Sequence, residues 1–158
     1  MNEPALHELA ARIAFLLGTW RGSGGGYYPM IVPFVYEEEV RFTHNGKPLL
    51  IYTQRTWHHE TGQPMHGEAG YFRPLENGGI EIVLAHPTGI VEIQEGTIDG
   101  TRITTRSKLV AKTTTAKEVT KLERTIKVDG DVLWYEVRMA AVGQPLQHHL
   151  SAALKRVG

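Results

Sequence analysis

The stretch Leu133-Trp134-Tyr135-Glu136-Val137-Arg138-Met139 alternates between two faces of an extended chain. Positions 133, 135, 137 and 139 place Leu, Tyr, Val and Met on one face, whereas Glu136 and Arg138 lie on the other. A period of two residues is typical of an antiparallel strand with one face on a core and the other in water. This stretch therefore predicts a β-strand.

The same alternation recurs on both sides of this stretch. Further strands are predicted at Thr19–Tyr27, Val35–Phe42, Leu49–Trp57, Met65–Phe72, Ile80–His86, Ile90–Ile98, Thr101–Val110, Lys121–Val128 and Gln147–Arg156. Turn dipeptides such as Asn45-Gly46, Asn77-Gly78, Asp99-Gly100 and Asp129-Gly130 separate them, and several are strong hairpin signals. We expect about ten strands joined by short loops.

A helical period occurs only near the N-terminus. Pro4 suits a first helical position, Leu6, Leu9, Ile13 and Leu16 follow at roughly helical spacing, and Gly18 supplies a stop. The sequence predicts one short N-terminal helix.

A meander of ten strands must protect its edges, and closure into a barrel is the simplest way to do so. We therefore expect an all-β, up-and-down antiparallel barrel, formed as one domain over residues 1–158 because no linker divides the chain. Eight or more strands leave room inside for a small ligand. A two-sheet sandwich is the alternative, which the hairpin-length connections make less favourable.

The composition excludes several classes of function. The chain has 158 residues, with 17 basic and 17 acidic side chains, so a nucleic acid or an anionic membrane is not expected as its main partner. The absence of Cys excludes disulfides, Cys-ligated zinc, iron–sulfur clusters and thiolate-ligated haem. The apolar run Ile13–Leu17 is too short for a signal peptide or a membrane span, so a cytoplasmic location is expected.

The glycine-rich run Gly18-Thr19-Trp20-Arg21-Gly22-Ser23-Gly24-Gly25-Gly26 could suggest a phosphate loop. The Lys-Ser/Thr of that loop and the helix after it are both missing. We expect instead that the glycines let the first strand bend as the barrel closes, and that Trp20 plugs one end.

The polar residues give weaker signals. His58-His59 and His148-His149 are poor chelates because neighbours on a strand face opposite ways, and no His-x-His or His-Glu-x-x-His pattern supports zinc. The carboxylates at Glu37–Glu39 are read as a solvated face, and His86 before Pro87 as a turn residue. Glu92 and Glu95 could line a cavity, but nothing makes them an acid–base pair.

One cofactor is compatible with the residues without being required by them. A barrel with a His near its mouth, with Met30 and Met65 nearby and small residues such as Ser151 and Ala153, could hold a haem, since neutral imidazole is a good axial ligand for iron.

The chain also resembles the nitrobindin family over nearly its whole length. Gly18, Trp20, Gly22 and Gly24 reproduce the family's Gly-x-Trp-x-Gly-x-Gly motif. Further matches are Tyr28-Pro29-Met30-Ile31, Gly46-Lys47-Pro48, Tyr52-Thr53-Gln54, His66-Gly67-Glu68-Ala69-Gly70-Tyr71, Ala85-His86-Pro87-Thr88-Gly89 and Gln144-Pro145-Leu146-Gln147-His148-His149-Leu150. The motif alone is moderately specific, whereas the ordered set is strong.

The resemblance implies a ten-stranded barrel similar to the fatty-acid-binding proteins and lipocalins, with haem b at one open end. It implies that His149 is the axial ligand of the iron, and that Met30, Met65 and His66 lie on the distal side. It also implies nitric oxide binding and isomerisation of peroxynitrite to nitrate at a ferric haem. Family members commonly carry Thr where this chain has Met30, which changes one distal polar contact.

Strict alternation makes one position in this assignment ambiguous. It groups His148 with Leu150, Ala152 and Leu154, which would turn His148 inward if that face lines the cavity. We choose His149 because small neighbours suit a flat macrocycle and the family motif points there; a bulge in this last strand would also change the parity.

Two other functions remain open at this stage: a barrel that carries a fatty acid or another apolar molecule, and a haem-dependent nitric oxide sensor or carrier without turnover. A homodimer, formed through the barrel wall or the N-terminal helix, is a further expectation that no motif specifies.

Overall fold

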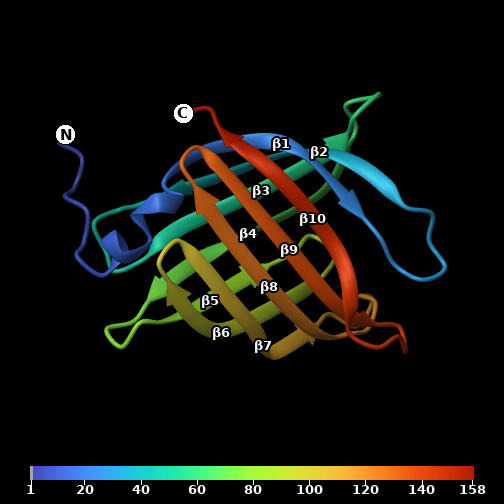
Figure 1. Ribbon diagram of the computed structural model, residues 1–158. Coiled ribbons are helices and arrows are strands. Elements are labelled where there is room, and N and C mark those ends of the chain that lie inside the picture. Colours follow the sequence, from blue (N-terminus) through green and yellow to red (C-terminus); the bar gives the residue numbers. More distant parts are fainter. Residues whose placement is uncertain (1) are drawn as a thin grey trace.

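The computed structural model describes residues 2–158 as a closed antiparallel barrel with a short helical segment at its N-terminus (Figure 1). This confirms the predicted fold class. The elements are η1 (Ala10–Leu16), β1 (Gly18–Gly26), β2 (Phe34–Thr43), β3 (Leu50–His58), β4 (Pro64–Pro74), β5 (Gly79–Ala85), β6 (Ile90–Asp99), β7 (Arg102–Lys112), β8 (Val119–Asp129), β9 (Val132–Ala141) and β10 (Gln147–Arg156).

The barrel closes because the first strand pairs with both its neighbour and the last strand. Trp20 on β1 lies opposite Val40 on β2 and Arg156 on β10. Each strand from β2 to β9 pairs with the strands before and after it in the sequence. The up-and-down order follows from the short hairpin loops, which leave consecutive strands adjacent and antiparallel.

The N-terminal segment plugs one end of the barrel. It is a 3-10 segment of seven residues with a kink at Ile13, and it starts at Ala10 rather than at Pro4 as the sequence predicts. So short a segment depends on packing for its stability, and Ala10, Ile13 and Leu16 are fully buried against the core. The predicted apolar spacing is correct, but only its second half forms a helix.

Trp20 fixes this plug, as the sequence predicts. Its Nε1 donates a hydrogen bond of 2.8 Å to the Leu16 carbonyl, and the Arg156 guanidinium lies 4.2 Å from the centre of its ring. Arg156 also donates to the carbonyls of Phe15 and Leu17, at the end of the helical segment. Next to the plug, the rings of Phe42, Tyr52 and Phe72 pack together and fill the barrel.

The glycines of β1 make room for aromatic rings from β2. Gly24 pairs with Tyr36 and Gly26 with Phe34. A Cβ atom on Gly24 would lie 2.4 Å from Cζ of Tyr36, so the ring occupies the space that a side chain would need. The motif therefore lets Tyr36 cover the inner face of β1, a role of packing rather than of phosphate binding.

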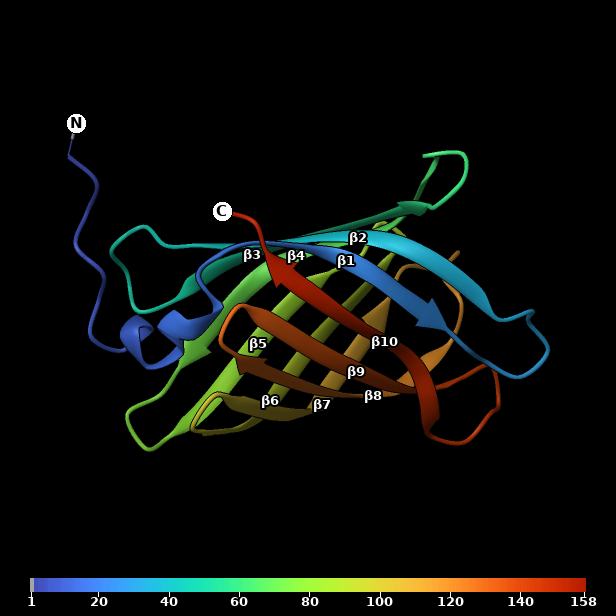
Figure 2. The same cartoon turned by 45° about the horizontal axis from the view of Figure 1, so that its top comes forward.

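The other end of the barrel is open. There the loops β1–β2, β3–β4, β5–β6, β7–β8 and β9–β10 extend away from η1 and both chain ends (Figure 2). The pairing of β7 with β8 runs only from Arg102 opposite Lys127 to Arg106 opposite Glu123. Beyond that pair the two strands separate, so the wall opens toward this end.

The glycine packing gives a first prediction. In Gly24→Ala the new methyl group must displace Tyr36 from a buried position, which costs about 1–3 kcal/mol of folding free energy. Thermal unfolding followed by circular dichroism should show a midpoint lower by about 2–4 °C for each kcal/mol. Gly25→Ala is the matched control, because the atoms nearest to its Cβ belong to the half-exposed Tyr27 side chain and lie no closer than 3.2 Å. Equal midpoints for the two variants would contradict this packing role.

Candidate functional site

A cavity of about 760 Å³ lies at the open end of the barrel. Its wall is largely apolar, with residues such as Ile90, Val119, Leu122, Val137 and Met139. One side carries the polar side chains His66, Glu68, His86 and Arg124, and His149 contributes a further imidazole. Cavities of this size and character bind small molecules and cofactors.

A β-bulge directs His149 into this cavity. The pairing of β10 with β9 runs from His148 opposite Arg138 directly to Leu150 opposite Val137, so His149 is the extra residue. Strict alternation holds from Leu150 to Lys155 and is broken just before Leu150. As a result, the adjacent residues His149 and Leu150 both line the cavity. His148 is exposed and has its Nδ1 3.7 Å from Glu136 on the outer wall. The parity change considered in the sequence analysis is present.

Hydrogen bonds to the end of β1 set the orientation of His149. Its Nδ1 lies 3.0 Å from the Tyr27 carbonyl oxygen, and the Tyr27 amide donates a 2.7 Å bond to the His149 carbonyl. A carbonyl can only accept, so Nδ1 carries the proton and Nε2 keeps a free lone pair. Burial lowers the pKa of His149, which favours the neutral ring. The site thus presents an uncharged imidazole nitrogen, the form in which His binds a metal.

Tyr28 holds the loops around this imidazole in place. Its ring packs edge-on against the His149 ring with centres 5.5 Å apart. Its hydroxyl accepts a 2.7 Å hydrogen bond from the Ala141 amide and lies 3.1 Å from the Ala141 carbonyl oxygen. The loop after β1 and the end of β9 are therefore joined beside His149.

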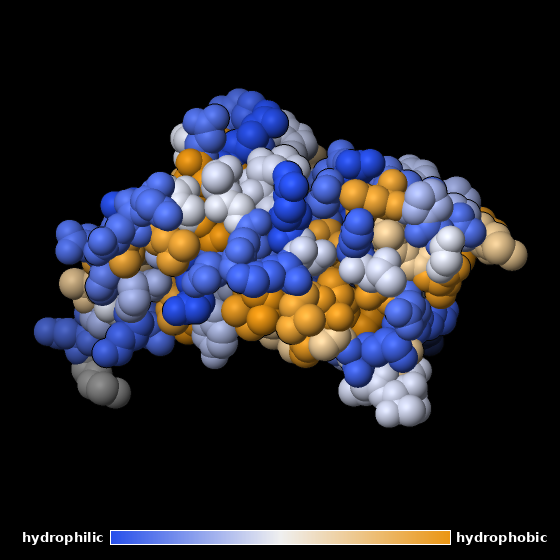
Figure 3. Space-filling model, turned by 90° about the horizontal axis from the view of Figure 1, so that it is seen from below, coloured by the Kyte–Doolittle hydropathy of each residue, from blue (hydrophilic) through white to orange (hydrophobic). Residues whose placement is uncertain are grey.

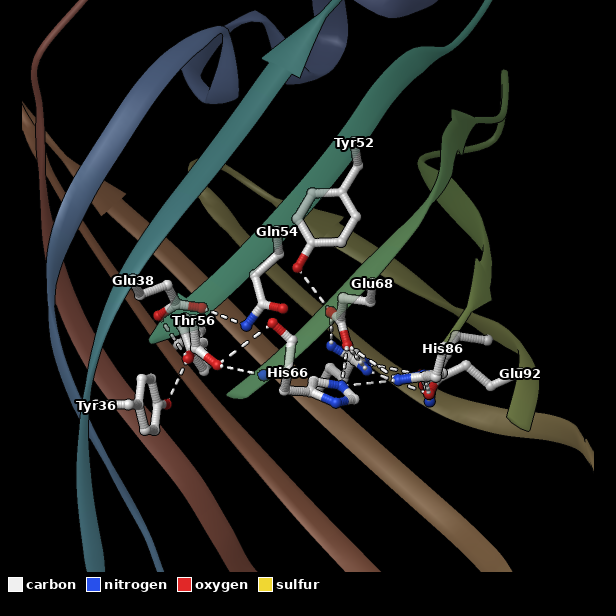
Figure 4. Close-up of polar contacts among 12 residues, drawn as sticks. Tyr36, Glu38, Tyr52, Gln54, Thr56, His66, Glu68, His86 and Glu92 are labelled. Carbon is white, nitrogen blue, oxygen red and sulfur yellow. Dashed lines mark hydrogen bonds and ion pairs between the residues drawn. The ribbon is translucent and has the colours of Figure 1, made fainter. Parts of the chain in front are cut away.

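A buried ion cluster forms the polar side of the cavity (Figure 4). The guanidinium of Arg124 on β8 binds Glu92 on β6, with Nε 2.7 Å from Oε1, and Glu68 on β4, with Nη1 2.9 Å from Oε1. Tyr52 donates a further 2.7 Å bond to Oε1 of Glu68. Burial alone would raise the pKa of both carboxyls, but Arg124 outweighs it and lowers both, that of Glu92 to about 2.

Two histidines extend this cluster toward the open end. Nε2 of His86 lies 2.7 Å from Oε2 of Glu92, and Nδ1 of His86 lies 3.1 Å from Nε2 of His66. Since ionised Glu92 only accepts hydrogen bonds, His86 carries its proton on Nε2 when it is neutral, and its Nδ1 accepts one from His66. Burial lowers the pKa of His66.

A second buried network lies deeper in the barrel. The Tyr135 hydroxyl donates a 2.7 Å bond to Glu38, Gln54 donates a 2.6 Å bond to the same carboxyl, and the hydroxyls of Tyr36 and Tyr135 are 2.6 Å apart. Burial raises the pKa of Glu38 to about 7, against these two stabilising bonds. Oε1 of Gln54, the other end of the same amide, is buried without a hydrogen-bond partner.

Only some of the site residues predicted from the sequence line the cavity. His149 and His66 line the cavity, and Met30 lies on its rim with 97% of its surface exposed. Met65 is 43% exposed and, within residues 2–158, is not one of the lining side chains. Gly18, Trp20, Gly22 and Gly24 lie on β1, where they serve packing at and beyond the plug.

The expectation of a solvated face is wrong for Glu38 and Glu39, and the turn role expected for His86, which accepts a bond from the Gly89 amide, is incomplete. Glu38 is buried inside the barrel rather than solvated, because β2 turns it onto the same face as Tyr36 and Val40. Glu39 faces outward, yet it is buried beneath Arg21 and Arg55, which hydrogen-bond to it. His86 is a member of the ion cluster rather than only a turn residue.

Sequence reasoning also missed Glu68 and Arg124. The signal was present in the alternation: on β4, β6 and β8 the inward positions include Glu68, Glu92, Gln94 and Arg124, on the same faces as core residues such as Phe72 and Ile126. A charged residue on an apolar face marks a paired, buried group.

Comparison with known proteins identifies the family. Residues 10–156 match the model of the THAP4-like, haem-binding β-barrel domain. The chain belongs to this family. Membership confirms the predicted resemblance and supports haem as the cofactor.

Relatives of similar length cover nearly the whole chain. A protein named peroxynitrite isomerase Rv2717c from Arabidopsis thaliana is 48% identical over 158 residues, with 99% of this chain and 93% of the relative covered. A protein named peroxynitrite isomerase 2 from Mycobacterium avium is 52% identical over 157 residues, with 96% of both covered. The crystal structure of Rv2717c from M. tuberculosis superposes with a TM-score of 0.92 at 46% identity, covering 98% of this chain and 100% of that one.

The residues at the open end fit a haem. The cavity is wide, its wall is mostly apolar, and one neutral imidazole presents a free nitrogen. A flat macrocycle with an iron centre needs these three features.

Within residues 2–158, no helix has the length and apolar character needed to cross a membrane.

Glu38 gives a prediction for the pH dependence of stability. Between its usual pKa of 4.5 and about 7, the folded protein keeps a proton that the unfolded chain has released. Raising the pH therefore favours unfolding, and the free energy of unfolding should fall by roughly 3 kcal/mol across this interval. Glu38→Gln removes this fall in urea titrations at pH 5 and pH 7.5.

Glu37→Gln is the control for this measurement, because it changes the same charge on the neighbouring, outward-facing residue and keeps the fall. The contribution of Glu38 is the difference between the two variants. If Glu38→Gln loses as much stability with rising pH as the wild type, the proton does not reside on Glu38.

Proposed function

We propose that this protein binds haem b through Nε2 of His149 and isomerises peroxynitrite to nitrate. The observation that carries the proposal is the bulged His149, whose Nδ1–H is held by the Tyr27 carbonyl while Nε2 remains free beside a mostly apolar cavity. Relatives at about 50% identity are named peroxynitrite isomerases. When bound, the haem iron supplies a Lewis-acid and redox centre for the peroxide group.

The residues of this chain prepare the cavity for that cofactor. Tyr27 fixes the tautomer of His149, and Tyr28 restricts the rotation of its ring. The apolar wall displaces water and favours small uncharged ligands such as nitric oxide. Met30, Met65 and His66 are proposed to flank the distal side of the haem.

The barrel interior argues against a fatty acid as the ligand. Between the ion cluster and the plug, the cavity lined by Phe42, Tyr52 and Phe72 has a volume of about 30 Å³, room for one or two water molecules. Aromatic rings and the Arg124 cluster fill the space that an acyl chain would need. A nitric oxide sensor would use the same haem site as a peroxynitrite isomerase. Only the turnover of peroxynitrite distinguishes the two functions.

Substitution of the two adjacent histidines tests the haem ligand. His149→Ala should lose the Soret band of haem-reconstituted protein, because no other imidazole is presented by the bulge. His148→Ala should keep the band, since that ring lies on the outer wall. Retention of a wild-type spectrum by His149→Ala would refute the assignment.

Stopped-flow kinetics separate an enzyme from a sensor. Haem-loaded wild-type protein should accelerate peroxynitrite decay and raise the yield of nitrate, whereas His149→Ala and haem-free protein should not. Equal decay with and without haem would exclude the isomerase activity while leaving nitric oxide binding intact.

We also propose that two copies associate through the outer wall of β4–β7. Tyr71, Val83, Val91 and Leu109 are exposed there, and strand register places Ile93 between Val83 and Leu109. Figure 3, which views the molecule from the side of β5–β7, has apolar side chains gathered on this face. Apolar patches of this kind usually mark protein interfaces.

Light scattering on a sizing column tests the association. Leu109→Lys places a charge on the β7 side of the patch, next to Ile93, and should halve the mass from dimer to monomer. Val157→Lys changes an exposed apolar residue at the C-terminus and should leave the mass unchanged. A monomeric wild type would exclude the dimer.

The proposal places the protein in the cytoplasm as one folded unit over residues 1–158. A Cys-free chain needs no oxidising compartment for its stability, which is consistent with this location. Cell fractionation with an antibody against the barrel checks it.

A further inference from the structure

Three side chains on the polar side of the cavity point nitrogen and oxygen atoms at one another. Nε2 of His66, Nδ1 of His86 and Oε2 of Glu68 are separated by 3.1, 3.5 and 3.9 Å. These separations match those between ligands of one metal ion: for bonds of 2.0–2.1 Å and tetrahedral angles, ligand atoms lie about 3.3 Å apart. In this structure a single point in their plane lies about 2 Å from all three atoms.

The neighbouring groups orient these atoms as metal ligands. Glu92 accepts the Nε2–H of His86 at 2.7 Å, which leaves the lone pair of Nδ1 directed at Glu68 and His66. In protein metal sites, a histidine that binds the metal through one ring nitrogen usually donates the proton on its other ring nitrogen to a carboxylate or a carbonyl. The 3.1 Å contact between the two imidazoles is a hydrogen bond in the metal-free form, and a metal ion would replace its proton.

Glu68 can bind a metal ion through one carboxylate oxygen while the other keeps its bonds to Arg124 and Tyr52. Its Oε1 accepts the close bonds from Tyr52 and Arg124, at 2.7 and 2.9 Å. Its Oε2 receives only a 3.2 Å contact from Arg124 and faces the two imidazoles. Two carboxylates and one guanidinium leave the cluster with one negative charge when the imidazoles are neutral, so a cation is electrostatically favoured there.

We propose that His66, Glu68 and His86 form a second metal site in the wall of the cavity, for Zn²⁺ or another divalent first-row ion. Two imidazoles and one carboxylate are ligands that these ions prefer, and a three-residue set leaves a fourth position open. All three residues line the cavity, so the open position is available to water or to a small ligand. The site lies on β4 and the end of β5, separate from His149 on β10.

Strand register explains how the site forms without a sequence motif. Ala69 on β4 pairs with Ala85 on β5, which places Glu68 opposite His86 one step further along. His66 precedes Glu68 by two residues and shares its face. The ligands are therefore neighbours in the sheet although Glu68 and His86 are 18 positions apart in the sequence.

Zinc titration of the haem-loaded protein tests the proposal. We expect one equivalent of tightly bound Zn²⁺ by calorimetry and by metal analysis after dialysis against a weak chelator. X-ray anomalous scattering at the zinc edge should place the ion between the three side chains. Stoichiometric binding should be lost in His66→Ala, which leaves the Glu68–Arg124–Glu92 ion cluster intact. Glu92→Gln should weaken binding about 10–100-fold.

Two control variants distinguish this site from zinc bound elsewhere on the protein. His58 and His59 are the alternative place for adventitious zinc, because β3 ends at His58 and the two rings stack instead of facing opposite ways as the sequence predicts. The double variant His58→Ala/His59→Ala should bind zinc as the wild type does. His149→Ala and haem-free wild-type protein, titrated side by side, should each also keep one equivalent, whether or not the haem assignment is correct. Binding that survives His66→Ala, or that disappears with His58 and His59, would overturn the proposal, as would a wild-type protein that binds no zinc.

Discussion

The buried guanidinium of Arg124 determines how the inside of this barrel is divided. It binds Glu92 on β6 and Glu68 on β4 from its own position on β8, so it ties together three strands that do not pair directly. Isolated buried charges are strongly unfavourable, and the three ions are acceptable only as a set. The cluster closes off an aromatic core on the side of the plug and leaves the cavity on the other side.

His149 depends on a different constraint, the parity of a β-strand. In a regular strand, His149 would share the outward face with Ala153, and His148 would point inward with Leu154. One extra residue at the bulge reverses this for the end of β10 without disturbing the pairing of Ala152 and Leu154 farther along. The main-chain bonds with Tyr27 then hold the bulged residue in place, so the imidazole is positioned by backbone groups rather than by other side chains.

The sequence predicted the fold well because alternation and turn dipeptides are local signals. All ten strands lie where their pattern indicates, and the extent of the helical segment is the main error. The family resemblance indicates His149 as the haem ligand, which stays a prediction. Alternation alone turns His148 inward, whereas the structure places His149 in the cavity, because a bulge cannot be read from side-chain types. The cluster around Arg124 could not be assembled, since its members come from separate strands and meet only through barrel closure. The available signal for these buried clusters was a charged residue on the apolar face of β2, β4, β6 and β8. On β2, the sequence analysis interpreted Glu38 as part of a solvated face.

The early separation of β7 from β8 gives this closed barrel a free sheet edge. Past Arg106 and Glu123, the main chains of the two strands are no longer paired, although the Leu122 amide still donates a 3.0 Å bond to Oγ of Ser107 on β7. Such an edge is a template on which another chain can add a strand and begin to aggregate. Lys112 and Lys117 are exposed at the end of β7 and in the loop after it, and their charges oppose the approach of a foreign strand. The unpaired edge of this barrel thus carries its own protection against misassembly.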